Sequence, residues 1–351
     1  MSNCLAAAYP LLAERLQKTV LAELPTPVST AHFESTAGLR TISIKHDDVS
    51  SAHYGGNKVR KLEYILQRAR ERGARRIATF GSAGSNHALA TAMLATASGY
   101  ECTCLLSHQP RTANIARTLN MHRLIGTELV PYGGRVDPLA TFRRYLQGRC
   151  CWVIPLGGSS WLGAVGFVNA GLELAAQVAA GQLTAPARIY IANGTMGSSV
   201  GLALGLALAD MPTVLHAVRV VDDRFASIAR FERLLQKTAM MLRRLDPSIP
   251  DNIAERTRLC WRDEFFAGGY ALADDTTKAA VRLANGQMGL QLETTYTGKA
   301  MSALLHDMAA PDYAGEHFLF WNTYNSRPLP VTTERPPSPG NIPIDFMRYF
   351  E

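Results

Sequence analysis

Short apolar runs rich in β-branched residues alternate along this chain with longer stretches rich in Ala and Leu. Such runs predict buried strands; they lie at 75–80, 101–107, 152–156, 187–192, 214–221 and 317–323. Strands that alternate with helices indicate right-handed crossovers and a mostly parallel sheet with helices on both faces. The 351 residues are enough for two such α/β domains.

Other segments show helical spacing or interrupt it. Near the N-terminus, apolar residues recur at helical spacing, which predicts an amphipathic helix on the body of the protein; they are Leu11, Leu12, Leu16 and Val20. The Arg- and Leu-rich segment 224–250 predicts one or two amphipathic helices. Residues 332–343 are rich in proline, and we expect an ordered tail crossing the surface.

The stretch 55–73, "GGNKVRKLEYILQRARERG", frames a lysine unusually closely. Asn57 is a good N-cap and Gly73 a good stop, so Lys58 is predicted at the first helical position. The positive end of a helix disfavours an ammonium ion and lowers its pKa, which suits an amine that forms Schiff bases. From this stretch alone, a surface lysine at a helix start remains an equal alternative.

Two glycine-rich turns follow predicted strands, where ligands bind in parallel sheets. Ser85 and Asn86 offer a hydroxyl and an amide after the first, although helix capping would also explain both. In the second, Gly194–Ser199, glycines and hydroxyls predict a phosphate cradle that matches neither the P-loop nor the dinucleotide pattern. A framed lysine and a separate phosphate cradle together suggest pyridoxal phosphate.

Composition narrows the possible partners. The net charge is +7, but the arginines at 68–76 are interrupted by acidic and apolar residues, which favours a solvated helix face over a nucleic-acid site. No apolar run reaches the roughly 18 residues of a membrane span, and the N-terminus lacks a secretion pattern. The six cysteines are scattered, so we expect reduced thiols, no metal and a cytoplasmic location.

Five motifs occur in a familiar order: "GGNKVRKLEY", "GSNHALATA", "IPLGGSSWLGAVGF", "FFAGGYA" and "YTGKAM". In these the chain resembles the D-cysteine desulfhydrase and 1-aminocyclopropane-1-carboxylate deaminase family over roughly 24–330. The resemblance implies a two-domain α/β fold of the fold-type-II pyridoxal-phosphate enzymes, related to the tryptophan synthase β chain. Residues 1–60 and 170–351 would form the large cofactor-binding domain, and 61–169 the small domain.

The resemblance also implies roles for individual residues. Lys58 would be the Schiff-base lysine, Asn86 would lie near the ring 3-oxygen, and Ser85 near the substrate carboxylate. Tyr270 and Tyr296 match the two active-site tyrosines. The phosphate would contact Lys61, Gly194, Thr195, Met196, Gly197 and Ser198, and the substrate pocket would include His87 and Trp161.

Departures from the family pattern concern the substrate more than the cofactor. Thr297 stands where the cyclopropane deaminases carry Glu, as in the desulfhydrases, and Gly84 replaces the usual Gln before Ser-Asn. The usual His-Thr-Gly-Gly is Asn-Thr-Tyr-Asn at 322–325. We therefore expect Thr297 or Thr323 at the ring nitrogen, and Tyr324 and Asn325 in a substrate pocket that prefers larger or polar β-substituents over D-cysteine.

These observations predict a pyridoxal-phosphate-dependent lyase that acts on a small amino acid as a homodimer. It would eliminate a β-substituent and give a 2-oxo acid and ammonia. Cyclopropane ring-opening deamination is an alternative, against which Thr297 counts. A pyridoxal-phosphate-binding regulatory protein without turnover is another, and Lys58 and the two tyrosines argue against it.

Overall fold

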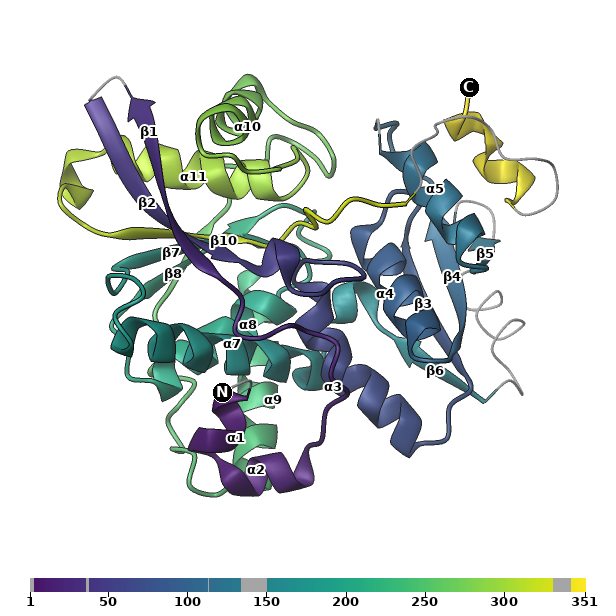
Figure 1. Cartoon of the computed structure of the whole chain (residues 1–351), viewed down its shortest axis with the longest axis horizontal. Helices are drawn as coiled ribbons and strands as arrows, with labels where there is room; N and C mark the ends of the chain where they lie inside the picture. Colours follow the sequence, from purple (N-terminus) through teal and green to yellow (C-terminus); the bar gives the residue numbers. More distant parts are fainter. Residues whose placement is uncertain (1–2, 36–37, 113, 134–149, 331–341) are drawn as a thin grey trace.

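Two β-sheets organise the chain, and they lie side by side in Figure 1. The structure is a computed structural model that describes residues 3–35, 38–112, 114–133, 150–330 and 342–351. Residues 1–2, 36–37, 113, 134–149 and 331–341 are outside this description.

The larger sheet has six strands in the order β1-β2-β10-β7-β8-β9. Their bounds are β1 Val28–Ser35, β2 Gly38–His46, β7 Arg188–Asn193, β8 Val214–Arg219, β9 Leu259–Arg262 and β10 Phe318–Asn322. Every neighbouring pair is parallel apart from β1 and β2. One face carries α7 Trp161–Ala179, α8 Gly197–Leu208 and α9 Ile228–Leu245, and the other carries α10 Asp275–Gln287 and α11 Thr297–Ala309 (Figure 1). The core therefore lies on both faces of this sheet, as the near-continuous apolar strands predict.

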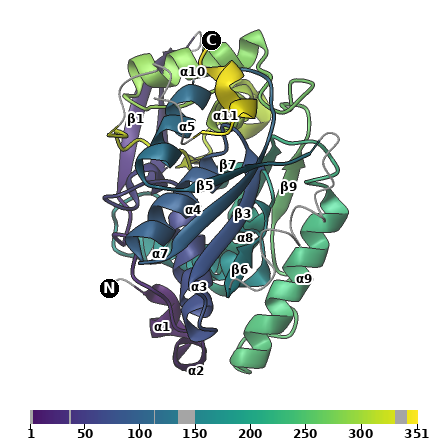
Figure 2. The ribbon, with the colours of Figure 1, turned by 90° about the vertical axis from the view of Figure 1, so that its right-hand side faces the viewer.

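The smaller sheet has four parallel strands in the order β5-β4-β3-β6. Its strands are β3 Arg76–Ser82, β4 Glu101–Ser107, β5 Glu128–Pro131 and β6 Cys151–Ile154, with helices α4 Asn86–Ala97 and α5 Ile115–Leu124 (Figure 2). Helix α3, Lys58–Glu71, packs against both α4 and α7. It thus joins the two halves of the molecule.

All six predicted strands are present, with ends shifted by one or two residues. The predicted helix in 224–250 is confirmed as α9. The N-terminal prediction is wrong in part: two short helices, α1 Cys4–Ala8 and α2 Pro10–Arg15, replace one long helix. Leu12 and Leu16 are buried as expected, but Leu11 is 45% exposed, and Val20 follows the helices and is 80% exposed.

The predicted domain boundaries meet three structural exceptions. The boundary between residues 60 and 61 falls inside helix α3. Helix α7 runs through the boundary at 170 as one continuous helix, and it is apolar enough to cross a membrane but mostly buried in the core. The resemblance places residues 342–351 in the large domain, but this segment lies beside the small sheet in Figure 1. Its Phe346 and Tyr349 pack in the core of that sheet. The proline-rich tail predicted at 332–343 lies almost wholly outside the described residues.

Candidate active site

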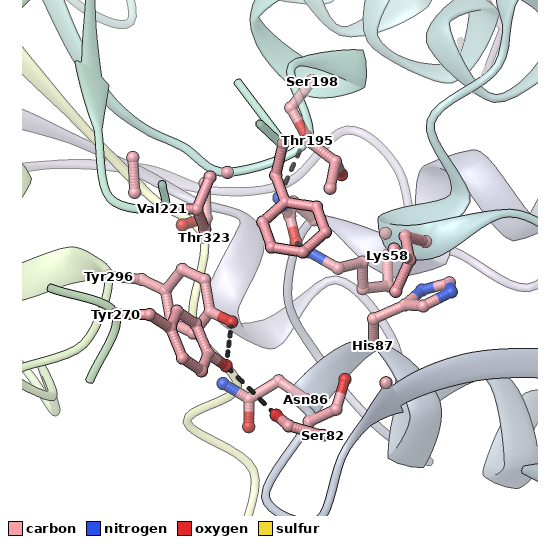
Figure 3. Close-up of a pocket in the computed structure, with 18 of the residues that line it drawn as sticks. Lys58, Ser82, Asn86, His87, Thr195, Ser198, Val221, Tyr270, Tyr296 and Thr323 are labelled. Atoms are coloured by element: carbon pink, nitrogen blue, oxygen red, sulfur yellow. Dashed lines mark hydrogen bonds between the residues drawn. The ribbon is translucent and has the colours of Figure 1, made fainter. Parts of the chain in front are cut away.

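A cavity of about 450 Å³ lies between the two sheets. Residues at or just beyond the ends of five parallel strands line it: Ser82 of β3, Ser107 of β4, Asn193 of β7, Val221 beyond β8 and Thr323 beyond β10. The carboxyl ends of the strands of both sheets therefore converge on one space, where parallel α/β proteins bind ligands. Figure 3 shows Lys58 and His87 on one side of this cavity and Tyr270 and Tyr296 on the other.

The two glycines before Lys58 are required by close backbone contacts. A side chain at position 55 would place its Cβ 1.8 Å from the Asp48 carbonyl oxygen, and Gly56 has φ +96°. The Gly56 N–H donates to the Asp47 carbonyl, and the Asn57 N–H donates to the Thr323 carbonyl at 3.1 Å. These contacts fix the chain that leads into α3, so Lys58 starts from a defined point.

Lys58 is the first residue of α3, as the sequence predicts. Its Nζ donates to Asn57 Oδ1 at 2.7 Å. Burial lowers the pKa of Lys58 to about 8. The pKa is thus lowered, as the sequence predicts, but the cause is desolvation and not the positive end of the helix. About a tenth to a fifth of this amine is therefore neutral near pH 7, far more than for an ordinary lysine, and the neutral amine is the form that reacts with a carbonyl.

Asn57 does not cap α3, contrary to the sequence prediction. Its side chain accepts no hydrogen bond from the first turn, and its own backbone is already helical. The amide instead spans the cavity floor, with Nδ2 donating to Ser198 Oγ at 2.9 Å while Oδ1 accepts from Lys58. Asn57 therefore links the lysine to the turn at the start of α8.

A buried group of charges holds the opposite face of the α3 start. Arg60 donates to Asp47 and to Glu173, all with almost no exposure, and Lys45 donates to Glu173 at 2.6 Å. Burial alone would raise the pKa of Glu173, but Arg60 and Lys45 lower it to about 2. Because each charge is paired, these ions fix the helix rather than disrupt it.

The start of α8 forms the predicted cradle. Met196 has φ +67°, and the chain then turns into a helix of 12 residues with its N-terminus toward the cavity. Ser159 Oγ lies 2.7 Å from Thr195 Oγ1 and accepts from the Gly197 N–H at 3.1 Å. A Cβ at position 197 would lie 2.7 Å from Ser159 Oγ and 3.2 Å from Lys61 Nζ, so only glycine fits.

Lys61 brings a buried amine to this cradle. Its Nζ donates to the Gly157 carbonyl at 3.1 Å, and no salt bridge pairs it within the described residues. Burial, and then the charge of Lys58, lower the pKa of Lys61 well below its ordinary value. An anion at the α8 N-terminus would stabilise the charged form of this amine, so these residues fit the phosphate of pyridoxal phosphate.

Two tyrosines form the opposite wall. The Tyr270 and Tyr296 hydroxyl oxygens are 2.7 Å apart, and Ser82 Oγ lies 3.5 Å from Tyr270. Burial raises the pKa of both tyrosines, so both hydroxyls keep their protons. Glu293 accepts the backbone N–H groups of Tyr296 at 2.8 Å and Thr297 at 2.9 Å, which fixes Tyr296 at the start of α11.

Most of the predicted site residues line the cavity. These are Lys58, Lys61, Ser85, Asn86, His87, Gly194, Thr195, Met196, Ser198, Tyr270, Tyr296, Thr323, Tyr324 and Asn325. Ser85 also caps α4 by accepting the Ala88 N–H at 3.2 Å, so both interpretations of this residue apply. His87 Nε2 is 2.9 Å from Thr79 Oγ1, and burial lowers its pKa well below the ordinary value, which keeps the ring neutral.

Three predicted residues do not line the cavity. Trp161 is the first residue of α7 and is half-buried against the core, so its contact with the substrate stays a prediction. The Thr297 hydroxyl is held by Glu293, so Thr323 is the threonine that a ring nitrogen could reach. Gly197 lies behind the lining, where its lack of a side chain makes room for Ser159 and Lys61.

Asn325 lines the cavity but its side chain is already used. Its Oδ1 accepts the N–H groups of Gly55 at 2.7 Å and Arg327 at 3.1 Å, and its Nδ2 donates to the Arg327 carbonyl. The Asn325 side chain therefore holds the backbone at Gly55, in the turn before Lys58, and its polar atoms are not available to a substrate. Burial raises the pKa of Tyr324 to about 12, so it presents a neutral hydroxyl, and its effect on substrate choice stays a prediction.

Sequence reasoning missed several residues of the cavity wall. Ser82 could have been found as a hydroxyl at the end of a predicted strand, and Asn57 as the neighbour of the lysine. Gln109 lies in a loop without a recognisable motif, so only the structure identifies it. Within the described ranges, no group of three or more His, Cys, Asp or Glu residues could hold a metal ion.

Comparisons with known proteins agree with this geometry. The family described as "Pyridoxal-phosphate dependent enzyme" matches residues 20–322. The chain is 36% identical over 279 residues to a D-cysteine desulfhydrase of Yersinia pestis (strain Pestoides F), covering 76% of this chain and 80% of that one. It is 33% identical over 301 residues to a D-cysteine desulfhydrase of Salmonella choleraesuis (strain SC-B67), covering 83% and 88%.

A solved structure shares the fold over nearly the whole length. The structure of an ACC deaminase homologue superposes with a TM-score of 0.74 at 25% identity, covering 92% of this chain and 95% of that chain. The predicted fold-type-II architecture and the predicted cofactor are therefore confirmed. By its sequence, its fold and the lysine and phosphate cradle of its cavity, this chain belongs to the pyridoxal-phosphate-dependent enzyme family.

Proposed function

We propose that this protein is a lyase that converts a small β-substituted amino acid to a 2-oxo acid and ammonia by a D-cysteine desulfhydrase-like elimination, with a substrate that differs from D-cysteine in its β-substituent. With D-cysteine, addition of one water would balance the products pyruvate, hydrogen sulfide and ammonia. The single observation that carries the proposal is the position of Lys58, Lys61 and the tyrosine pair around one cavity. The relatives named D-cysteine desulfhydrase support the substrate class.

The cofactor would be held by three parts of the cavity. The Lys58 amine would bind its aldehyde, the α8 start with Lys61 would bind its phosphate, and the Thr323 hydroxyl would face its ring nitrogen. When bound, pyridoxal phosphate supplies a ring that delocalises the negative charge left on the substrate α-carbon. A neutral hydroxyl cannot protonate the ring nitrogen as fully as a carboxylic acid could, which favours elimination over a long-lived carbanion.

The chain's own residues would move the protons. The free amine of Lys58 has a pKa of about 8, so it can accept the proton from the α-carbon near neutral pH. Tyr296 and Tyr270 share a hydrogen bond and keep their protons, so they can donate one to the leaving group. Ser82 lies within reach of Tyr270, which gives the pair a third hydroxyl.

The direct test is a product screen with purified, cofactor-loaded protein. D- and L-cysteine, other β-substituted amino acids of both hands and 1-aminocyclopropane-1-carboxylate would each be assayed for ammonia and 2-oxo acid release. We expect pyruvate from at least one β-substituted amino acid and no 2-oxobutanoate from the cyclopropane substrate. Release of 2-oxobutanoate as the main activity would favour the deaminase reaction, and no release from any substrate would contradict the lyase.

We further propose that the enzyme works as a cytoplasmic homodimer without nucleic-acid or membrane partners. The six cysteines form no disulfide bonds within the described residues, which supports a reducing compartment. The resemblance to the desulfhydrase family supports the dimer. Light scattering after size-exclusion chromatography would give the mass directly, and a monomer mass at micromolar concentration would contradict this part of the proposal.

A further inference from the structure

Gln109 lies in the loop after β4, next to the turn that holds Ser85 and Asn86. Its side chain fills the space beside Gly84, where the chain itself has no side chain. Gly84 has no side chain there, and a Cβ at this position would lie 3.0 Å from Ile115 Cγ1 and 3.1 Å from Gln109 Nε2. The Gln109 amide lines the cavity together with Ser85. A glutamine from a different element therefore stands next to Gly84.

The hydrogen bonds of Gln109 fix which way its amide points. Its Oε1 accepts the Gly84 N–H at 3.1 Å, so the oxygen is committed to the backbone. Its Nε2 makes only one long contact, to its neighbour Pro110 at 3.5 Å. The N–H groups of this amide are thus the part of Gln109 that a ligand in the cavity can use.

Ser85 offers a second donor beside this amide. The Ser85 oxygen accepts the Ala88 N–H, so the hydroxyl proton is free to donate. Both side chains stand at the N-terminus of α4, a helix of 12 residues that favours negative charge. Two donors and a helix N-terminus suit an anion, and the anion common to all amino-acid substrates is the α-carboxylate.

Residues from the far end of the chain hold Gln109 in place. The Tyr349 hydroxyl accepts the Gln109 N–H and donates to the Gln109 carbonyl, both at 3.0 Å. Tyr349 is buried with Phe346 against the small sheet, and both rings lie close to His108. The segment 342–351 therefore anchors a loop that lines the cavity, although none of its own residues line the cavity.

We propose that Gln109 is a substrate-binding residue that donates to the substrate α-carboxylate beside Ser85, and that Tyr349 is its positioning residue. This inference rests on the proposed function. Gln109 would supply, from a different loop, the amide N–H donor that is missing because Gly84 replaces the usual Gln. It also gives the segment 342–351 a role in substrate affinity.

Two substitutions at Gln109 separate binding from structure. Gln109→Glu keeps an oxygen for the Gly84 N–H but replaces the donor with a negative charge, whereas Gln109→Leu removes both. A purely structural role makes Glu the milder change. A carboxylate-binding role makes Glu the more severe change, because it repels the ligand.

The probes are alanine of each hand and ethylamine, since alanine lacks a β leaving group and ethylamine is alanine without its carboxylate. Binding to the holoenzyme would be followed by the absorbance of the bound cofactor and by the shift in the midpoint of thermal unfolding. We expect the alanine Kd to rise about tenfold in Gln109→Leu, the effect of one hydrogen bond to a charged group, and further in Gln109→Glu. Tyr349→Phe should raise it about threefold, and the ethylamine Kd should change less than twofold in every variant.

Matched controls are Gln236→Leu, on the exposed face of α9, and Tyr313→Phe, outside the cavity. Equal losses for alanine and ethylamine, an unchanged alanine Kd, or wild-type protein that binds alanine no better than ethylamine would each overturn the inference. Failure of the proposed function appears separately, as wild-type protein without a cofactor spectrum or without product release.

Discussion

The hydroxyl oxygens of Tyr270 and Tyr296 lie 2.7 Å apart, although 26 residues separate them in the chain. Tyr296 stands at the start of α11, where the Glu293 carboxylate accepts its backbone N–H. Tyr270 lies in the loop before α10. In that loop, the Phe266 and Gly269 carbonyls accept hydrogen bonds from Lys299 of α11. One helix therefore sets the positions of both tyrosines.

This pairing predicts the effect of removing one hydroxyl. Tyr296→Phe should keep the cofactor and its spectrum, because the ring remains, but lose turnover by a factor of about 10² to 10⁴. Steady-state kcat and the cofactor Kd would be measured on the same preparation, with Tyr313→Phe as control. A loss of kcat under tenfold would show that the Tyr296 hydroxyl carries no proton in the reaction.

The cradle at the start of α8 predicts a steric effect on cofactor binding. Gly197→Ala would put a Cβ 2.7 Å from Ser159 Oγ and 3.2 Å from Lys61 Nζ, so the turn must shift. We expect the cofactor Kd to rise at least about tenfold, since 1.4 kcal/mol of lost phosphate contact corresponds to that factor. Gly286→Ala in α10, where a Cβ meets nothing within 4 Å, is the matched control. Equal cofactor retention by the two variants on dialysis would place the phosphate elsewhere.

The side chain of Asn325 predicts a different effect from that of a specificity residue. Asn325→Ala leaves the Gly55 N–H without its acceptor, which should lower the free energy of unfolding by about 1–3 kcal/mol and weaken cofactor binding. Asn285→Ala is a matched control, because Asn285 likewise bonds the backbone of Leu292 but lies outside the cavity. Urea denaturation and cofactor titration would be compared. If both variants lose stability but Asn325→Ala binds the cofactor with unchanged affinity, the hydrogen bond between Asn325 and Gly55 does not position Lys58.

The pKa of Lys58 predicts the pH dependence of cofactor capture by the apoprotein. The neutral amine is the reactive form, so the capture rate should rise with pH and level off above about 8, not continue toward the ordinary lysine value of 10.5. The difference of 2.5 units corresponds to about 300-fold more neutral amine below pH 8. Stopped-flow absorbance would follow capture, with Lys58→Ala as blank. A rate still climbing at pH 10 would mean that burial does not lower this pKa.

The sequence alone predicts those elements whose pattern of residues lies within a single segment of the chain. The apolar runs of β3, β4 and β7 predicted their strands, and the glycine–asparagine frame placed Lys58 at the first turn of α3. β1 and β2 were missed because neither is a continuous apolar run: β1 buries only Ala31 and Phe33, and its antiparallel pairing with β2 is seen only in the structure. Patterns within one segment do not reveal contacts between segments.

The same limit explains the errors at the site. Asn57 is a residue type that commonly caps helices. Its side chain instead donates a hydrogen bond to the Ser198 hydroxyl in the cavity, and Ser198 is 141 residues away in the sequence. Asn325 occupied a position expected to face the substrate, and its bond to Gly55 spans 270 residues. Gln109 has no motif at all, and its position depends on Tyr349. Long-range partners decided all three.

The central claim is that Lys58 is the residue that binds the cofactor, and borohydride reduction of the purified holoenzyme tests it most directly. Reduction fixes the cofactor covalently to the amine that holds it, and mass spectrometry of the digested protein then locates the pyridoxyl group. Lys61 is the natural competitor, because it is also buried in the cavity with a lowered pKa. We predict a modified peptide at Lys58 and none in a Lys58→Ala variant, whereas modification at Lys61 or at no lysine would contradict this account of the site.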